Sequence, residues 1–143
     1  MSDERTLHVE VVTPDGEVYH ADVAMVVLPG VDGELGILPR HQPLVTLLSI
    51  GETRIRRVSD DWDYIATGIG YAQVLFDKVL VVVDHGELAG AIDVARAEEA
   101  HSRAKDRMKE RGDLGAQAEV DYFRAEQALK RAENRLSVSR RAT

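Results

Sequence analysis

The sequence changes character after Gly86, and this change constrains the fold more than any other feature. Before it, apolar residues alternate with polar ones in short runs separated by turns, as in the run 7–11 ahead of the Thr-Pro-Asp-Gly turn at 13–16. Such alternation is typical of half-buried strands. After it, alanine, glutamate and arginine dominate, which favours helix. We therefore expect a β domain over residues 1–87 and a helical hairpin over residues 88–143.

Strand-like runs recur roughly every 8 to 12 residues in the first part, and no helical period lies between them. This spacing favours an antiparallel sandwich or barrel over a parallel sheet. Asp77 and Lys78 should close the last hairpin tightly. The expected strands are 7–11, 23–28, 34–38, 44–48, 53–58, 64–67, 71–76 and 79–83.

The second part predicts two antiparallel helices, over about 92–111 and 117–137. The glycines in 112–115 are suited to ending the first helix and turning the chain. The apolar positions of the second helix follow a spacing of four and three residues, which predicts a continuous seam. The seam residues are Ala118, Tyr122, Ala125, Leu129, Ala132 and Leu136, facing Ala97, Ala100, Ala104 and Met108.

A hairpin with an alanine-rich seam buries little apolar area, so it is marginally stable alone. We expect it to lean on the β domain or on a partner, and to detach and melt separately from the β domain. The fold class is therefore α+β, an N-terminal antiparallel β part followed by an antiparallel two-helix hairpin.

Charge follows the same division. The net charge is −7, yet residues 1–90 carry 6 of the 18 Lys and Arg and 15 of the 25 Asp and Glu. After Tyr122 the second helix is basic. A mobile basic helix suits an acidic protein surface or a phosphate-bearing ligand. Charge alone favours the simpler interpretation, a solvated helix face.

Composition excludes several classes of function. The chain has no cysteine, so disulfides and thiolate sites are excluded, and no apolar run approaches the roughly 20 residues of a membrane span. The first residues show no secretory signal. The five histidines have no metal-ligand spacing, and no phosphate loop or nucleophile motif is present. We expect a non-catalytic protein on the cytoplasmic side, with no metal, no nucleic-acid partner and no direct membrane insertion.

Four arginines of the hairpin can converge. Arg96 lies one turn after Asp93, and Arg103 is seven residues further on the same helix face. Arg131 and Arg135 lie one turn apart near the end that an antiparallel hairpin returns toward Asp93. A cluster of guanidinium groups suits a polyphosphate. Spacing alone favours the alternative, salt bridges with Glu98, Glu99 and Glu133.

Several ordered motifs then become specific. The strongest is the Gly-Glu-Leu-Gly-Ile-Leu-Pro segment at 33–39, followed by His41 and Pro43-Leu44. The others are the turn at 13–16, Gly-Ile-Gly at 68–70, Ile-Asp-Val-Ala-Arg-Ala at 92–97 and the tail 129–138. On these motifs the chain resembles the epsilon subunit of F-type rotary ATP synthases over essentially its whole length.

The resemblance implies a β-sandwich bound to the gamma subunit and resting on the c-ring, and a hairpin that folds down or extends along gamma. Carried over by motif, the c-ring and gamma contacts are Val31, Asp32, Gly33, Glu34, Leu35, Gly36 and His41. In the extended form the second helix would approach the beta subunit, within the alpha and beta hexamer, and block hydrolysis. The residues implied for the beta contact are Arg124, Lys130, Arg131 and Arg135.

Some bacterial members of that family also bind ATP on the folded hairpin, as a regulatory ligand and not as a required cofactor. The residues that match that motif and its supporting positions are Glu87, Ile92, Asp93, Arg96, Ala97, Arg103, Arg131 and Arg135. The glycine-rich link at 112–115 departs from the pattern and would let the helices splay.

The resemblance implies a non-catalytic subunit of a proton-translocating ATP synthase, peripheral on the cytoplasmic face of the bacterial cell membrane. It would couple ion-driven rotation to ATP synthesis and restrain hydrolysis. Two alternatives stay open, a stand-alone nucleotide-sensing module and an adaptor without rotary partners.

Overall fold

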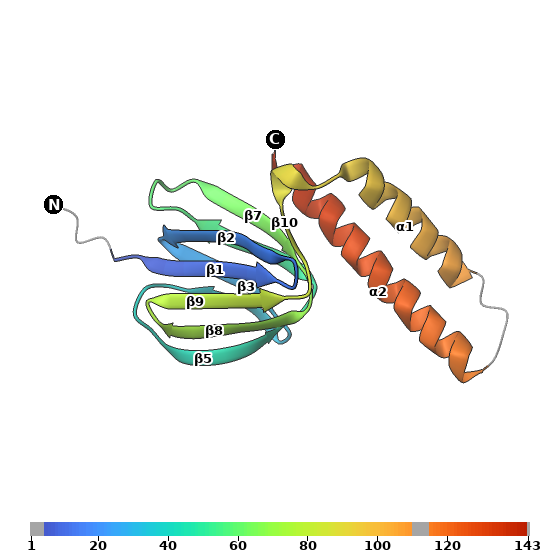
Figure 1. The fold of residues 1–143 in the computed structure, drawn as a ribbon, viewed down its shortest axis with the longest axis horizontal. Coiled ribbons are helices and arrows are strands. Elements are labelled where there is room, and N and C mark those ends of the chain that lie inside the picture. The colour runs from blue at the N-terminus through green and yellow to red at the C-terminus, as the bar shows by residue number, and fades with distance from the viewer. Residues whose placement is uncertain (1–4, 110–114, 143) are drawn as a thin grey trace.

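The computed structural model describes residues 5–109 and 115–142, and Figure 1 shows a β-sandwich with a helical hairpin at one end. Ten strands form the sandwich. They are β1 Leu7–Thr13, β2 Gly16–Val23, β3 Met25–Gly30, β4 Gly33–Ile37, β5 His41–Leu48, β6 Gly51–Arg56, β7 Trp62–Thr67, β8 Gly70–Phe76, β9 Lys78–Val83 and β10 Gly86–Leu88.

The strands follow the order β10-β7-β6-β3-β5-β8-β9-β1-β2, and β4 pairs with β3. All pairings are antiparallel except that of β1 with β9, which is parallel, with Val9 opposite Val79. The antiparallel sandwich is confirmed with this one exception. A tight turn forces antiparallel pairing, whereas seven strands separate β1 from β9 in the sequence, so no turn sets their relative direction.

Alternation along the strands explains the core. Leu7, Val9 and Val11 of β1 are fully buried, while the residues between them are only partly buried. The same inward positions recur on β8 and β9 at Val74 and Val79. One cluster of aliphatic side chains therefore fills the sandwich, and the predicted alternation is confirmed.

Three strand predictions differ from the structure. No strand was predicted over 16–22, although the turn at 13–16 indicated a hairpin, and β2 occupies Gly16–Val23. The run 23–28 is not one strand, because β2 ends at Val23 and β3 begins at Met25 and continues to Gly30. The backbone N–H of Ala24 donates to the carbonyl of Arg56, so the chain changes partner there. An unbroken apolar run hides such a change. The strand β10 was not predicted, because three residues carry no detectable period.

The hairpin consists of α1 Val94–Lys109 and α2 Ala116–Ser139, flanked by short 3-10 helices at Ala89–Ala91 and Arg140–Ala142. The Asp93 carboxylate accepts the backbone N–H of Arg96 at 3.1 Å, so α1 begins two residues later than the predicted start at 92. The predicted end at 111 and the turn residues 112–114 lie outside the described residues.

The predicted seam faces inward. Ala97 and Ala104 of α1 and Ala125 and Ala132 of α2 are buried. The other predicted seam positions on both helices are half-buried. Small residues in contact let the two helix axes lie close together.

The C-terminal half of α2 attaches the hairpin to the sandwich. The side-chain amide of Asn134 donates to the carbonyl of Gly51 at 2.8 Å, and Val138 is fully buried in a small cluster with Ala66, Ala89 and Ile92. Beyond α2, Arg141 binds both carboxylate oxygens of Glu52 and lies 4.8 Å from the ring centroid of Tyr64. The rest of the hairpin projects from the sandwich (Figure 1).

Candidate functional site

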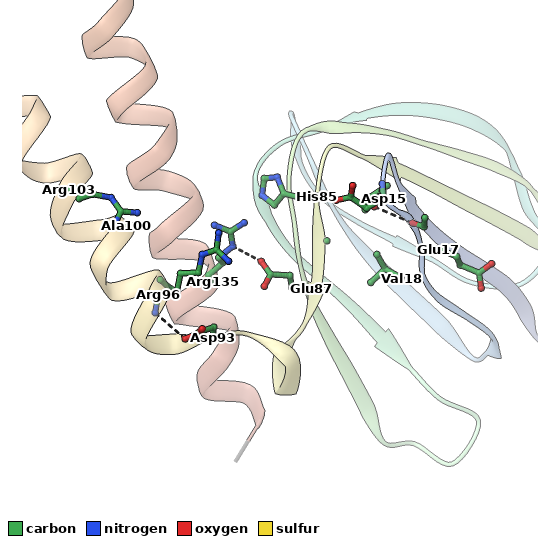
Figure 2. A pocket seen from close by; sticks show the side chains of 14 residues that line it. Asp15, Glu17, Val18, His85, Glu87, Asp93, Arg96, Ala100, Arg103 and Arg135 are labelled. Carbon is green, nitrogen blue, oxygen red and sulfur yellow. Dashed lines mark hydrogen bonds and ion pairs between the residues drawn. The ribbon is translucent and has the colours of Figure 1, made fainter.

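A cleft of about 590 Å³ lies between the hairpin and the sandwich. Its size is within the range of small-molecule sites. Figure 2 shows side chains of α1 and α2 on one side and side chains of the β1–β2 turn and of β10 on the other. The cleft is lined by Thr13, Asp15, Gly16, Glu17, Val18, His85, Gly86, Glu87, Asp93, Arg96, Ala97, Ala100, Arg103 and Arg135.

The helical wall follows from residue spacing on α1. Arg96, Ala100 and Arg103 recur every three to four residues and so share one face of the helix. Ala97 and Ala100 are small and leave space, while the two arginines project guanidinium groups toward it (Figure 2). Each guanidinium presents several N–H donors and a permanent positive charge.

Among the arginines that line this cleft, Arg135 is the one that forms a salt bridge. Its Nε donates to Oε1 of Glu87 at 2.5 Å, joining α2 to β10. Among residues 5–109 and 115–142, Arg96, Arg103 and Arg131 form no salt bridge.

The alternative prediction, that glutamates of the hairpin neutralise these arginines, is therefore wrong for the described part of the chain. Glu133 instead lies 3.7 Å from Nε2 of His101 across the two helices. Two guanidinium groups thus remain available in the cleft for an anion.

Six of the eight residues predicted for a nucleotide site line the cleft, and two do not. The six are Glu87, Asp93, Arg96, Ala97, Arg103 and Arg135. Ile92 is instead buried against Val138 and anchors the start of the hairpin. Arg131 lies outside the lining, although its charge acts on His85.

Sequence reasoning missed the second wall of the cleft. The Thr13 hydroxyl accepts the backbone N–H of Asp15 at 3.2 Å and donates to the carbonyl of Gly16 at 3.2 Å, which stabilises the β1–β2 turn locally. Gly16 has φ +124°, a conformation that favours glycine. The turn was recognisable, but its position opposite α1 depends on the packing of the hairpin.

His85 joins the two walls electrostatically. Burial lowers its pKa most, the nearby carboxylate of Asp84 opposes this, and the charges of Arg135 and Arg131 lower it further. The imidazole is therefore neutral at pH 7. Together with Arg96 and Arg103 it gives the cleft hydrogen-bond donors and an imidazole acceptor.

Of the residues predicted for contacts with other subunits, only Arg135 lines this cleft. Val31 and Asp32 form the exposed β3–β4 turn, and Gly33, which has φ +126°, and Glu34 are exposed at the start of β4. Leu35 is half-buried and Gly36 is exposed on β4, while His41 begins β5. The Glu34 carboxylate pairs with Arg54 at 3.0 Å. On α2, Arg124 and Lys130 are exposed, whereas Arg131 and Arg135 are half-buried.

Residues 5–109 and 115–142 contain neither a metal-binding cluster nor a membrane-spanning helix. No group of three or more histidines and carboxylates there is placed to hold a metal ion. None of the helices there combines the length and the hydrophobicity that crossing a bilayer requires.

Two protein-family models match almost the whole chain and divide it at the same point as the structure. The model described as ATP synthase, Delta/Epsilon chain, beta-sandwich domain matches residues 6–89. The model described as ATP synthase, Delta/Epsilon chain, long alpha-helix domain matches residues 91–140.

Curated relatives are similar over nearly full length. An ATP synthase epsilon chain of Halalkalibacterium halodurans is 46% identical over 136 residues, covering 95% of this chain and 98% of that protein. One from Bacillus mycoides is 44% identical over 135 residues, covering 94% and 97%.

Among solved structures, a chain of the Euglena gracilis mitochondrial ATP synthase matches with a TM-score of 0.77 and 18% identity, covering 94% of this chain and 81% of that one. A chain of the Tetrahymena thermophila mitochondrial ATP synthase central stalk and c-ring matches with a TM-score of 0.62 and 14% identity, covering 96% and 99%. At this identity the likeness supports the fold alone.

Proposed function

This chain belongs to the family of ATP synthase epsilon subunits, and from that membership we propose that it couples rotation of the central stalk to ATP synthesis and restrains ATP hydrolysis through its hairpin. The single observation that carries the proposal is the docked hairpin with unpaired arginines facing an open cleft. A movable element with two sets of contacts is what a conformational regulator needs.

The gamma subunit is the proposed partner of the sandwich. The outer face of β5 and β8 exposes large apolar side chains that the core does not use, including Val45, Leu47, Tyr71 and Leu75. Leu47 lies directly opposite Tyr71 on the neighbouring strand, so these two side chains adjoin on this face. Contiguous exposed apolar surface of this kind favours a protein partner.

The c-ring is the proposed partner of the β3–β4 turn. Val31 is 53% exposed at the tip of this turn, next to the exposed Asp32. An apolar side chain flanked by carboxylates suits a partner surface that is mostly polar and has a few apolar side chains. Through these contacts the protein would sit peripherally on the cytoplasmic face of the bacterial membrane.

ATP is the proposed regulatory ligand of the cleft. The guanidinium groups of Arg96 and Arg103 would hold the phosphates, and Arg135 would exchange its contact with Glu87 for a contact with the ligand. Because the cleft has one wall on each part, ATP would bind only when the hairpin is docked. It would then shift the population toward the docked state by its differential affinity for that state.

The beta subunit is the proposed partner of the extended hairpin. Arg124 and Lys130 are exposed already, whereas Arg135 is held by Glu87 in the docked state. In the docked hairpin Arg135 would contact Glu87 or ATP, and in the extended hairpin it would contact the beta subunit. The docked, ATP-binding state and the inhibitory state therefore exclude each other.

Titration calorimetry tests the ATP site directly. We expect binding heat with the full chain, and affinity about tenfold lower after Arg96→Ala or Arg103→Ala, because a hydrogen bond to a charged group is lost. Arg107→Ala is the matched control, since this exposed arginine of α1 does not line the cleft. Absence of heat at millimolar ATP would reject ATP as the ligand.

Co-purification and truncation test the rotary role. A tagged chain should bring down gamma and the alpha and beta hexamer from membranes, which a stand-alone nucleotide sensor or an adaptor would not. Removal of residues 91–143 from the assembled enzyme should raise ATPase activity and leave assembly intact. Unchanged hydrolysis would contradict the restraining role.

A further inference from the structure

His85 lies in the cleft, yet none of the proposed ligand contacts uses it. Its Nδ1 is 2.9 Å from Oδ1 of Asp84. The ring also packs against Gly68, where an added Cβ would lie 2.6 Å from Cε1 of the imidazole. The sandwich therefore holds His85 in place, and the ring points toward the hairpin (Figure 2).

Charged groups from every neighbouring element face this ring or share its cleft. On its own segment these are Asp84 and Glu87, and on α2 they are Arg131 and Arg135. The remaining charged residues that share the cleft are Asp15 and Glu17 from the β1–β2 hairpin, and Asp93, Arg96 and Arg103 beside α1.

The balance of these charges changes when an anion enters. In the free protein, burial and the guanidinium groups of Arg135 and Arg131 hold the pKa of His85 below its ordinary value. A polyphosphate bound in the cleft brings negative charge next to Arg135, so it offsets the effect of the positive charges and favours the protonated imidazole. The side chain can then carry a proton and donate to a phosphate oxygen.

We propose that His85 is a proton-coupled contact residue of the cleft, which takes up one proton when a nucleoside polyphosphate binds. The inference rests on the proposed ATP site and adds its regulation. By linkage, binding favours protonation and protonation favours binding to the same extent.

The direction of the pH effect follows. Affinity for ATP rises as the pH falls through the pKa of His85 in the complex, and it levels off below the lower pKa of the free protein. A fall in pH therefore strengthens the hold of ATP on the docked, non-inhibitory hairpin.

Proton NMR of the imidazole C–H signals in the full chain tests this, with and without ATP between about pH 5 and pH 8.5. His85→Gln assigns the signal among the five histidines. We expect the titration midpoint of His85 to rise on addition of ATP.

Calorimetry supplies the second measurement. Affinity of the native chain should increase about fivefold more than that of His85→Gln between pH 8 and pH 6. The variant is the necessary baseline, because the terminal phosphate of ATP titrates in the same range.

The outcomes separate the two proposals. If ATP binds but the His85 midpoint does not rise, or if His85→Gln keeps the whole pH dependence, the proton coupling is wrong and the ATP site stands. If ATP at millimolar concentration produces no heat at any pH in the range, both are wrong.

Discussion

Truncation of Val138 should release the hairpin from the sandwich without unfolding the sandwich. Val138 is 0% exposed. It packs against Ala66, Ala89 and Ile92, so it contributes to the attachment of the hairpin and not to the seam between the helices. Val138→Ala removes two buried carbon atoms at about 0.8 kcal/mol each, and the cavity left behind brings the loss to about 2 kcal/mol. At 1.4 kcal/mol per tenfold, the undocked population should rise about 30-fold.

Amide hydrogen exchange measured by mass spectrometry checks this value segment by segment. Amides in the C-terminal half of α2 should exchange about 30-fold faster in Val138→Ala, while β1 keeps its protection. The fluorescence of Trp62 offers a second measurement of undocking. The Trp62 ring stacks on the Tyr64 ring with 6.4 Å between their centroids, and Arg141 of the docked chain end lies over Tyr64.

The matched control is Val120→Ala, on the same helix but 44% exposed. This variant should leave exchange within about twofold of the native chain. The reasoning is refuted if Val138→Ala accelerates α2 by less than about threefold. It is refuted equally if β1 and α2 lose protection together, because the hairpin would then not be a separate unit.

Three further predictions concern local structure. Asp93→Ala should cost α1 about 1 kcal/mol by removing its N-terminal cap, seen as faster exchange in its first turn, whereas Asp93→Asn should not. Gly70→Ala should lower the free energy of unfolding, measured in urea, by more than about 3 kcal/mol, because the new Cβ would lie 1.9 Å from a backbone oxygen of β9. Gly90→Ala is the control and should be neutral, because its new Cβ meets nothing within 4 Å. Arg57 holds the pKa of Asp63 below its ordinary value, so Asp63→Asn should lower the free energy of unfolding by about 1 kcal/mol at pH 7. The difference in urea midpoint between the native chain and the variant should vanish as the pH falls through the folded-state pKa of Asp63.

Features set by neighbouring residues were predictable from the sequence alone. Alternation at Leu7, Val9 and Val11 identified a strand with one buried face, and the four-and-three spacing of α2 identified its seam. Both patterns result from the geometry of a single element, two residues per repeat in a strand and 3.6 in a helix. The convergence of Arg96, Arg103 and Arg135 followed from the same helical geometry plus an antiparallel turn.

Features that depend on contacts between distant segments were decided only by the tertiary structure. The parallel pairing of β1 with β9 and the three-residue strand β10 exist because other strands offer free backbone groups there. Ile92 belongs to the motif of the predicted site, yet packing places it in a small core with Val138.

The second wall of the cleft shows the same limit. Asp15 and Glu17 lie more than seventy residues before the arginines that they face, so no periodic pattern connects the two groups. His85 likewise becomes notable only when α2 brings Arg131 and Arg135 beside it. The sequence by itself determined two parts and their inward faces, and the docking of one part on the other created the cleft, because only packing brings their side chains together.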